Sequence, residues 1–286
     1  DENFHINIAD FTAKANASKS KFLLLSHMRG HITNMDKLVE ICKSLKIQII
    51  EDCAHTMGAK WDGKRSGNFG LVSAFSTQTY KHINSGEGGF LVTNDDEVIA
   101  KAIMHSGSYM LYKKHASSPN SAIFEKVKLK TANFSGRMDN LRSSILIPQL
   151  KDLDNKVIKW NNLYKELYDR LKTQDGIFIP NRDKREFYVG SSIQFRLKDF
   201  ADKKIQDFIK NCKKRGVDLK WRGNKKKKAY TSRYDSWKYL ENIPVLKNTL
   251  EILKTTLDMR IPLTFDNNDC RVIAEIIIEE FRKIKI

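Results

Sequence analysis

The chain has 286 residues, of which 41% are hydrophobic and 30% charged, and this mixture excludes a disordered chain. No apolar run approaches the roughly 20 residues of a membrane-spanning helix, and the polar first residues show no signal peptide. The four cysteines are scattered and form no CxxC pair, which argues against a zinc ribbon or a disulfide scaffold. We therefore expect a cytoplasmic protein without a membrane segment.

The formal net charge is +17, and residues 151–286 carry +12 of it. This excess suits an anionic partner, either nucleic acid or a phosphorylated small molecule, but solvated surface lysine explains it as well. Lysine outnumbers arginine by 37 to 14, and lysine reads bases poorly, so nucleic acid is the less favoured partner. The run Lys225–Lys228 is predicted to lie in a mobile loop, which either attracts a nucleotide-sugar diphosphate or is simply solvated.

Short apolar runs alternate with helical patterns in the first 130 residues. Residues 22–25 form a continuous apolar run, typical of a strand buried on both faces. A helix is predicted over 35–45 and a second strand over 47–50, which makes a β-α-β unit. Further strands are expected at 71–76 and 89–92, and a helix capped by Asp95 or Asp96 is expected to run to about His105. These elements predict an α/β domain with a mainly parallel sheet covered by helices.

The pattern changes at Met138, where apolar residues recur at helical spacing as far as Leu171. Pro148 should kink or split this long helix. Beyond it we expect strands at 176–179 and 189–195 and helices at 203–215 and 268–284. The chain is therefore predicted to have a large domain over 1–150, followed by a bridging helix and a smaller α+β domain over 151–286.

Four polar residues follow the predicted strands of the first domain. Asp52 comes directly after a strand, where ligands collect in α/β sheets, and could keep the nitrogen of a flat heteroaromatic ring protonated, with His55 near the same ring. Lys81 precedes a glycine-rich turn and could form an imine with an aldehyde, while the Ser76 hydroxyl could bind phosphate oxygens. This is the arrangement of a lysine that binds pyridoxal phosphate. The alternative is that Asp52 caps a turn and that His55 and Lys81 are surface residues.

Residues 51–95 read EDCAHTMGAKWDGKRSGNFGLVSAFSTQTYKHINSGEGGFLVTND. This string resembles the core of the DegT/DnrJ/EryC1/StrS family of pyridoxal-phosphate-dependent sugar aminotransferases, and the similarity extends over residues 20–150. The shared pattern is an acidic pair with Ala-(Gln/His), then Phe-Ser, a lysine, Gly-(Glu/Asp)-Gly-Gly and Val-Thr-Asn-Asp. The resemblance implies the aspartate-aminotransferase fold (fold type I), with pyridoxal 5'-phosphate as cofactor.

The resemblance also implies a role for each residue. Lys81 would form the internal aldimine and move protons between Cα and C4′. Asp52 would pair with the pyridinium nitrogen, and His55 would lie near the ring and its phenolic oxygen. Ser76 would bind the cofactor phosphate. Ser135 stands where the family has an asparagine that reaches the phosphate of the neighbouring subunit.

Two departures from the family pattern affect these expectations. Ser135 or Asn133 would have to substitute for the cross-subunit asparagine of the expected homodimer. Family chains also carry a further segment before the point at which this sequence begins, with a phosphate-binding turn and a ring-stacking aromatic residue. We accordingly expect a member truncated at its N-terminus, whose large domain is incomplete and which binds the cofactor weakly or lacks activity as it stands.

Three functions remain open from the sequence. The first is a transferase for amino-sugar biosynthesis that moves an amino group from glutamate or glutamine to a nucleotide-linked keto sugar or a keto-cyclitol. The second is a catalytically silent relative that binds the cofactor, and the third is a basic nucleic-acid-binding protein. Lys81 argues against the dehydratase branch of the family, which has histidine there. His27 and His31 have metal-ligand spacing, but Gly30 lies between them and no HExxH pattern exists, so we predict no metal site.

Overall fold

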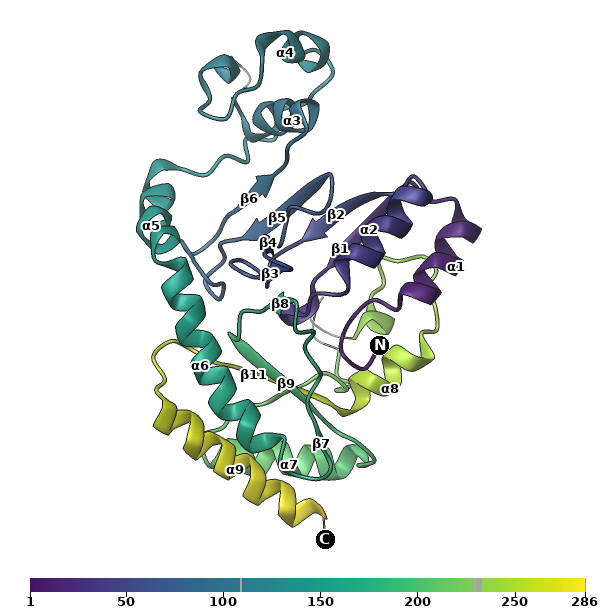
Figure 1. The fold of residues 1–286 in the computed structure, drawn as a ribbon, viewed down its shortest axis with the longest axis vertical. Coiled ribbons are helices and arrows are strands. Elements are labelled where there is room, and N and C mark those ends of the chain that lie inside the picture. The colour runs from purple at the N-terminus through teal and green to yellow at the C-terminus, as the bar shows by residue number, and fades with distance from the viewer. Residues whose placement is uncertain (109, 228, 230–232, 286) are drawn as a thin grey trace. The chain divides into compact units, whose positions relative to one another are not determined.

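The computed structural model describes residues 1–108, 110–227, 229 and 233–285 (Figure 1). The chain forms two compact units. The first comprises residues 6–154 and 184–189, and the second comprises residues 1–5, 155–183 and 190–286. The sequence-based boundary at residue 150 stays a prediction. Within the described residues, no helix has the length and apolarity needed to cross a bilayer.

The first unit is built on a four-stranded sheet with the order β1-β2-β5-β6. β1, β2 and β5 are parallel, and β6 is antiparallel to β5. Helix α2 joins β1 to β2, so the predicted β-α-β unit is confirmed. The Asn34 side chain caps this helix by accepting the Lys37 N–H. The elements are β1 (Phe22–Ser26), α2 (Met35–Ser44), β2 (Gln48–Asp52), β5 (Val72–Ser76) and β6 (Gly89–Val92).

The two faces of this sheet differ in burial. Leu25 and Ile49 lie on the face against which α2 packs, and both are buried. Phe22 and Leu24 point to the other face and are 57% and 70% exposed. The prediction that residues 22–25 are buried on both faces is therefore wrong. The reason is that apolarity predicts burial only where another element covers the strand, and the described chain covers β1 on one face only.

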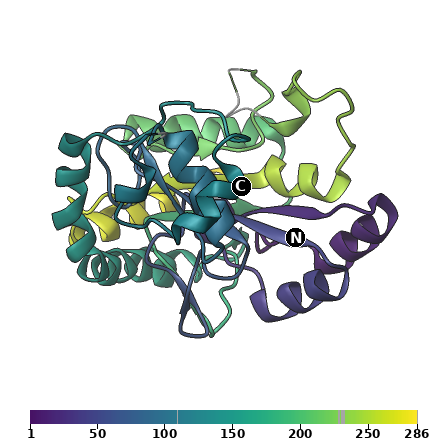
Figure 2. The ribbon, with the colours of Figure 1, turned by 90° about the horizontal axis from the view of Figure 1, so that it is seen from above.

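The remaining elements of the first unit surround this sheet. Helix α3 begins after Asp95, whose carboxylate accepts the Val98 N–H, so the predicted cap is confirmed. In both views α1 and α2 lie next to each other beside β1 (Figure 2). Neither α1 nor α4 was predicted from the sequence. The elements are α1 (Ile8–Ser18), β3 (Lys60–Trp61), β4 (Lys64–Arg65), α3 (Asp96–Ser106), α4 (Ser121–Val127), α5 (Asn140–Lys151) and β8 (Glu186–Phe187).

The long helix predicted over 138–171 is split, as Pro148 suggested. Helix α5 (Asn140–Lys151) contains Pro148, and α6 (Leu153–Leu171) begins after Asp152. The Asp152 N–H bonds to the Pro148 carbonyl, 3.2 Å away, which closes the last turn of α5. The break thus falls one helical turn after the proline.

The second unit contains an antiparallel sheet with the order β10-β11-β9-β7. Alternate residues of β9, namely Ile193, Phe195 and Leu197, are fully buried in its core. Helices α7 and α9 pack against each other (Figure 1), and both were predicted. The elements are β7 (Ile177–Phe178), β9 (Ser192–Leu197), α7 (Asp202–Lys214), β10 (Lys220–Trp221), α8 (Lys247–Thr255), β11 (Thr256–Arg260) and α9 (Asn267–Lys285).

Candidate active site

Asp52 is the last residue of β2 and is half-buried. Its Oδ1 accepts the Ala54 N–H at 3.1 Å, and its Oδ2 accepts the Ser26 hydroxyl at 2.8 Å. Asp52 therefore does cap the following turn, which was the alternative interpretation. An ionised carboxylate offers about four lone-pair positions, so these two bonds leave capacity for a ligand N–H.

Ser76 ends the neighbouring strand β5. Asp52 is paired in register with Ala74, and Ser76 lies two residues further, so Ser76 is on the same sheet face as Asp52. The Ser76 Oγ accepts the Gln78 N–H at 3.3 Å. Ala74 is exposed, and its small side chain leaves this face open beside both polar groups.

His55 and Lys81 come together although 26 residues separate them. The Lys81 Nζ lies 3.3 Å from the His55 Nε2, and both side chains are half-buried. His55 belongs to the turn after β2, which the Thr56 N–H closes on the Cys53 carbonyl at 3.1 Å. Gly30 has φ +81° and allows close packing, because a Cβ there would lie 2.9 Å from the His55 carbonyl oxygen.

The loop that carries Lys81 is anchored on both sides. The Lys81 N–H bonds to the Gln78 carbonyl at 2.9 Å. Gln149 of α5 binds the backbone of Asn84 twice: its Oε1 accepts the Asn84 N–H at 3.0 Å, and its Nε2 donates to the Asn84 carbonyl at 2.7 Å. Sequence reasoning missed Gln149, because nothing in the pattern of α5 marks one polar residue as a partner of a loop 65 residues away.

His82, directly after Lys81, was also missed. Its side chain is almost fully buried. Burial, followed by the positive charge of Lys81, lowers the pKa of His82 to about 4. The His82 ring is therefore neutral near pH 7 and adds no second positive charge beside the Lys81 amine.

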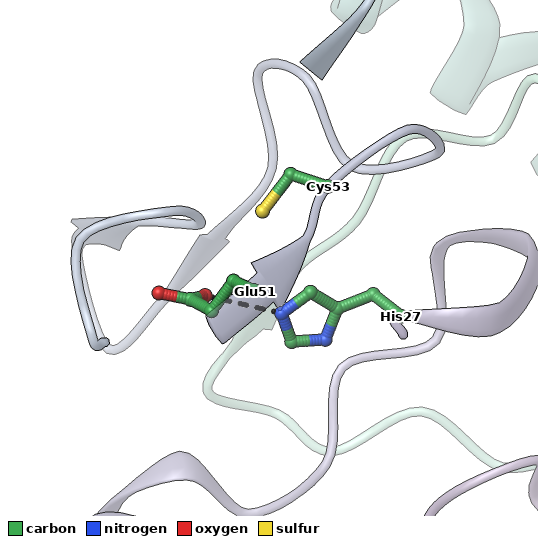
Figure 3. A group of neighbouring side chains, drawn as sticks. All are labelled: His27, Glu51 and Cys53. Carbon is green, nitrogen blue, oxygen red and sulfur yellow. Dashed lines mark hydrogen bonds and ion pairs between the residues drawn. The ribbon is translucent and has the colours of Figure 1, made fainter. Parts of the chain in front are cut away.

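The buried residues His27, Glu51 and Cys53 form the one group of potential metal ligands within the described residues (Figure 3). Glu51 accepts N–H groups from the backbone of the 67–70 turn, at 2.7–3.0 Å, and its Oε2 lies 3.1 Å from the His27 Nε2. Burial alone would raise the pKa of Glu51, but the His27 bond and the backbone N–H groups outweigh it, so that the pKa is lowered.

These contacts favour a structural role for the group over metal binding. Both Glu51 oxygens are already engaged, and burial raises the pKa of the Cys53 thiol to about 12, which disfavours the thiolate that a metal requires. The Glu51 carboxylate instead holds the 67–70 turn against the end of β2. No signal in the sequence distinguished Glu51 from its neighbour Asp52, beyond the alternation of faces along a strand.

Ser135 and Asn133 lie elsewhere in the first unit. The Asn133 Nδ2 donates to the Ser135 Oγ at 3.2 Å, and the Asn133 Oδ1 accepts the Ser135 N–H at 2.8 Å. The Ser135 Cα approaches Gly107, at the C-terminus of α3. These contacts belong to the α3 region and not to the strand ends, so a role of Ser135 in a neighbouring subunit stays a prediction.

The basic run lies in the second unit. Lys225, Lys226 and Lys227 are exposed, and the Lys225 Nζ lies 3.3 Å from a carboxylate oxygen of Asp202. Lys228 lies outside the described residues. The expected mobility and ligand attraction of this loop stay predictions.

The residues present fit pyridoxal phosphate by the chemistry of their donors and acceptors. Asp52 offers a carboxylate to a ring N–H, Ser76 offers a hydroxyl to a phosphate oxygen, and Lys81 offers a primary amine to an aldehyde. Asp52 and Ser76 share the open sheet face beside Ala74, and Lys81 contacts the turn that follows Asp52.

Solved structures of known proteins share this fold. An aminotransferase, TlmJ, from Streptoalloteichus hindustanus superimposes with a TM-score of 0.82 at 16% identity, covering 100% of this chain and 72% of that one. A 3-amino-5-hydroxybenzoic acid synthase gives 0.81 at 21% identity, covering 99% and 73%. A GDP-4-keto-6-deoxymannose-3-dehydratase with a trapped PLP–glutamate geminal diamine gives 0.79 at 20% identity, covering 97% and 72%. The predicted aspartate-aminotransferase-like α/β fold is confirmed.

Curated relatives are similar in sequence over part of their length. GDP-perosamine synthase of Escherichia coli O157:H7 is 30% identical over 154 residues, which is 54% of this chain and 39% of that protein. L-glutamine:2-deoxy-scyllo-inosose aminotransferase of Streptomyces kanamyceticus is 32% identical over 166 residues, 57% of this chain and 38% of that protein. The matched segments thus span less than half the length of these relatives.

The family model covers far more of the chain. The DegT/DnrJ/EryC1/StrS aminotransferase family matches residues 2–276. One relative is named an L-glutamine:2-deoxy-scyllo-inosose aminotransferase, and one structural neighbour holds a PLP–glutamate geminal diamine. The family and its cofactor were both predicted from the motif around Lys81. The chain belongs to the DegT/DnrJ/EryC1/StrS aminotransferase family, whose members use pyridoxal phosphate.

Proposed function

We propose that the protein transfers an amino group from glutamate or glutamine to a keto sugar, linked to a nucleotide, or to a keto-cyclitol. The observation that carries the proposal is the contact between Lys81 and His55, with Nζ 3.3 Å from Nε2 beside the strand end that bears Asp52. A primary amine, a carboxylate and an imidazole at the carboxyl end of a parallel sheet suit this chemistry.

Each residue has a defined task in this proposal. Bound pyridoxal phosphate supplies an electron-withdrawing ring that stabilises negative charge at the substrate carbon. Asp52 accepts the ring N–H and keeps that nitrogen protonated, while the Ser76 hydroxyl donates to the phosphate. The Lys81 Nζ takes the proton from the donor carbon and later returns one to the acceptor carbon. His55 positions the Lys81 amine through the contact between their side-chain nitrogens.

Names of the relatives support the substrate classes. One relative is named for glutamine and a cyclitol, and another is named GDP-perosamine synthase. The net charge of +12 on residues 151–286 suits an acceptor that carries a nucleoside diphosphate. Lysine at position 81 favours amino transfer over dehydration, since the dehydratase branch has histidine there.

The test is cofactor binding by Lys81 variants. We expect the unmodified protein to develop a visible absorption band with pyridoxal phosphate, and Lys81→Ala and Lys81→Arg to lose it, since neither can form the covalent bond to the aldehyde. Lys37→Ala removes the same charge from an exposed position on α2 and should keep the band. A band that survives in Lys81→Ala would overturn the proposal. Salt-sensitive binding to random duplex DNA without any band would favour the nucleic-acid alternative.

We further propose a homodimer in which Ser135 reaches the phosphate of the neighbouring subunit. Helix α5 supports it, because Leu141 and Ile145 lie one turn apart on the same face of this helix and are 72% and 43% exposed. Light scattering should give twice the chain mass for the unmodified protein, and Leu141→Glu with Ile145→Glu should give a monomer. A monomeric unmodified protein would contradict the dimer.

A further inference from the structure

The ends of β1 and β2 are joined by two side-chain pairs on opposite faces of the sheet. Ser26 and Asp52 are partners in the parallel register. On one face the Ser26 hydroxyl donates to the Asp52 Oδ2 at 2.8 Å. On the other face the His27 ring meets the Glu51 carboxylate at 3.1 Å. The dipeptides Ser26-His27 and Glu51-Asp52 are thus linked twice.

The buried His27–Glu51 pair fixes the position of the exposed Ser26–Asp52 pair. Glu51 is fully buried, and N–H groups from Gly67, Phe69 and Gly70 hold its carboxylate. The His27 N–H also bonds to the Asp52 carbonyl at 3.2 Å. The backbone on either side of Ser26 and Asp52 is therefore anchored, and the Ser26 hydroxyl is presented to one carboxylate oxygen.

The Ala54 N–H alone leaves the Asp52 carboxylate free to turn about that single bond. A second donor on the other oxygen removes this freedom, because each oxygen is then bound from a different strand or turn. A donor to an ionised group is also stronger than a neutral hydrogen bond. Ser26 thus orients the Asp52 carboxylate.

We propose that Ser26 is a positioning residue, whose hydroxyl holds the Asp52 carboxylate in the orientation that binds the pyridine nitrogen of pyridoxal phosphate. The inference rests on the proposed function, because it assigns Asp52 to the cofactor ring. It adds a residue that acts on the cofactor only through Asp52.

The experiment compares the pyridoxal phosphate affinity of three serine variants by titrating the visible band. Ser26→Ala should weaken binding about tenfold, the value of one hydrogen bond to a charged group. Ser26→Thr keeps the hydroxyl and should bind within about twofold of the unmodified protein. Ser44→Ala is the matched control, since that hydroxyl bonds only a carbonyl of its own helix, Ile41, at 2.9 Å.

The outcomes separate the two proposals. A tenfold loss in Ser26→Ala, with Ser26→Thr and Ser44→Ala near the unmodified protein, supports the role of Ser26. Unchanged affinity in Ser26→Ala overturns that role and leaves the proposed function intact. Equal loss in Ser26→Ala and Ser26→Thr also overturns it, because the hydroxyl would then not be the operative group. An unmodified protein that binds no cofactor overturns both proposals.

Discussion

Polar residues gather in two places in this molecule, and they are used differently. On the antiparallel sheet of the second unit, Asp258 accepts from Arg222 at 2.5 Å and from Gln194 at 2.9 Å, and both Asp258 and Gln194 are buried. At the strand ends of the first unit, Asp52 and Lys81 are only half-buried. The first set consists of polar groups that satisfy one another inside the fold. The second set keeps part of its capacity for a ligand.

The difference in burial between these two groups of polar residues predicts that removing a carboxylate has a different effect in each. A buried ion pair that loses one partner leaves an uncompensated charge, whereas a half-buried side chain is resolvated when its partner is removed. Substitutions on the sheet of the second unit should therefore reduce stability, and those at the strand ends should reduce cofactor binding.

The largest effect is expected for Asp258→Ala. The Arg222 guanidinium, whose side chain is 13% exposed, would lose its carboxylate partner, and the free energy of unfolding should fall by about 3–5 kcal/mol. Urea denaturation of the unmodified protein and the variant measures this difference. Asp218→Ala, in the same unit, is the control and should change stability little, because the Asp218 side chain is 81% exposed. A loss below about 1 kcal/mol in Asp258→Ala would contradict a structural network.

The next effect concerns pH and His82. Because the pKa of His82 is lowered from 6.5 to about 4 in the folded chain, the unfolded chain binds more protons between these values. The contribution of His82 is therefore fully present above pH 6.5 and is lost as the pH falls towards 4, by about 3 kcal/mol in all. His82→Gln should flatten the fall in stability between pH 6.5 and 4.5, measured by denaturation at each pH.

Two features keep this pH test specific to His82. The pKa of Glu51 is lowered from 4.5, so its contribution is present above pH 4.5 and is lost below that value. The measurement above pH 4.5 thus excludes most of the Glu51 effect. His115→Gln changes an exposed histidine and should leave the slope as it is. An equally steep slope in His82→Gln would rule out burial of a neutral His82.

The smallest effect on stability is expected for Asp52→Asn. The amide keeps an oxygen for the Ala54 N–H, so the unfolding free energy should change by less than about 1 kcal/mol. The cofactor affinity should fall more than tenfold, because the negative charge opposite the ring nitrogen is lost. Denaturation and titration of the visible band measure the two quantities. A variant that loses stability but keeps affinity would reverse the contrast between the two regions.

Local patterns were enough to predict much of the fold. The helix at Met35–Ser44 was predicted from apolar residues at helical spacing, and the strands on either side were predicted from short apolar runs. The short helix Ser121–Val127 was missed because its pattern is too brief to stand out. The exposed face of β1 was missed because apolar composition does not state what covers a strand.

In the candidate site too, some features follow from the sequence and others only from the tertiary structure. The order and spacing of Asp52, His55, Ser76 and Lys81 along the chain are properties of the sequence, and the resemblance of residues 51–95 to a known pattern named the family and its cofactor. Tertiary structure alone decided that the Lys81 amine meets His55, that Gln149 anchors the Asn84 backbone and that Ser26 binds Asp52. These contacts join residues 26 or more positions apart. They depend on strand register and on which face each side chain takes, and both are properties of the assembled sheet.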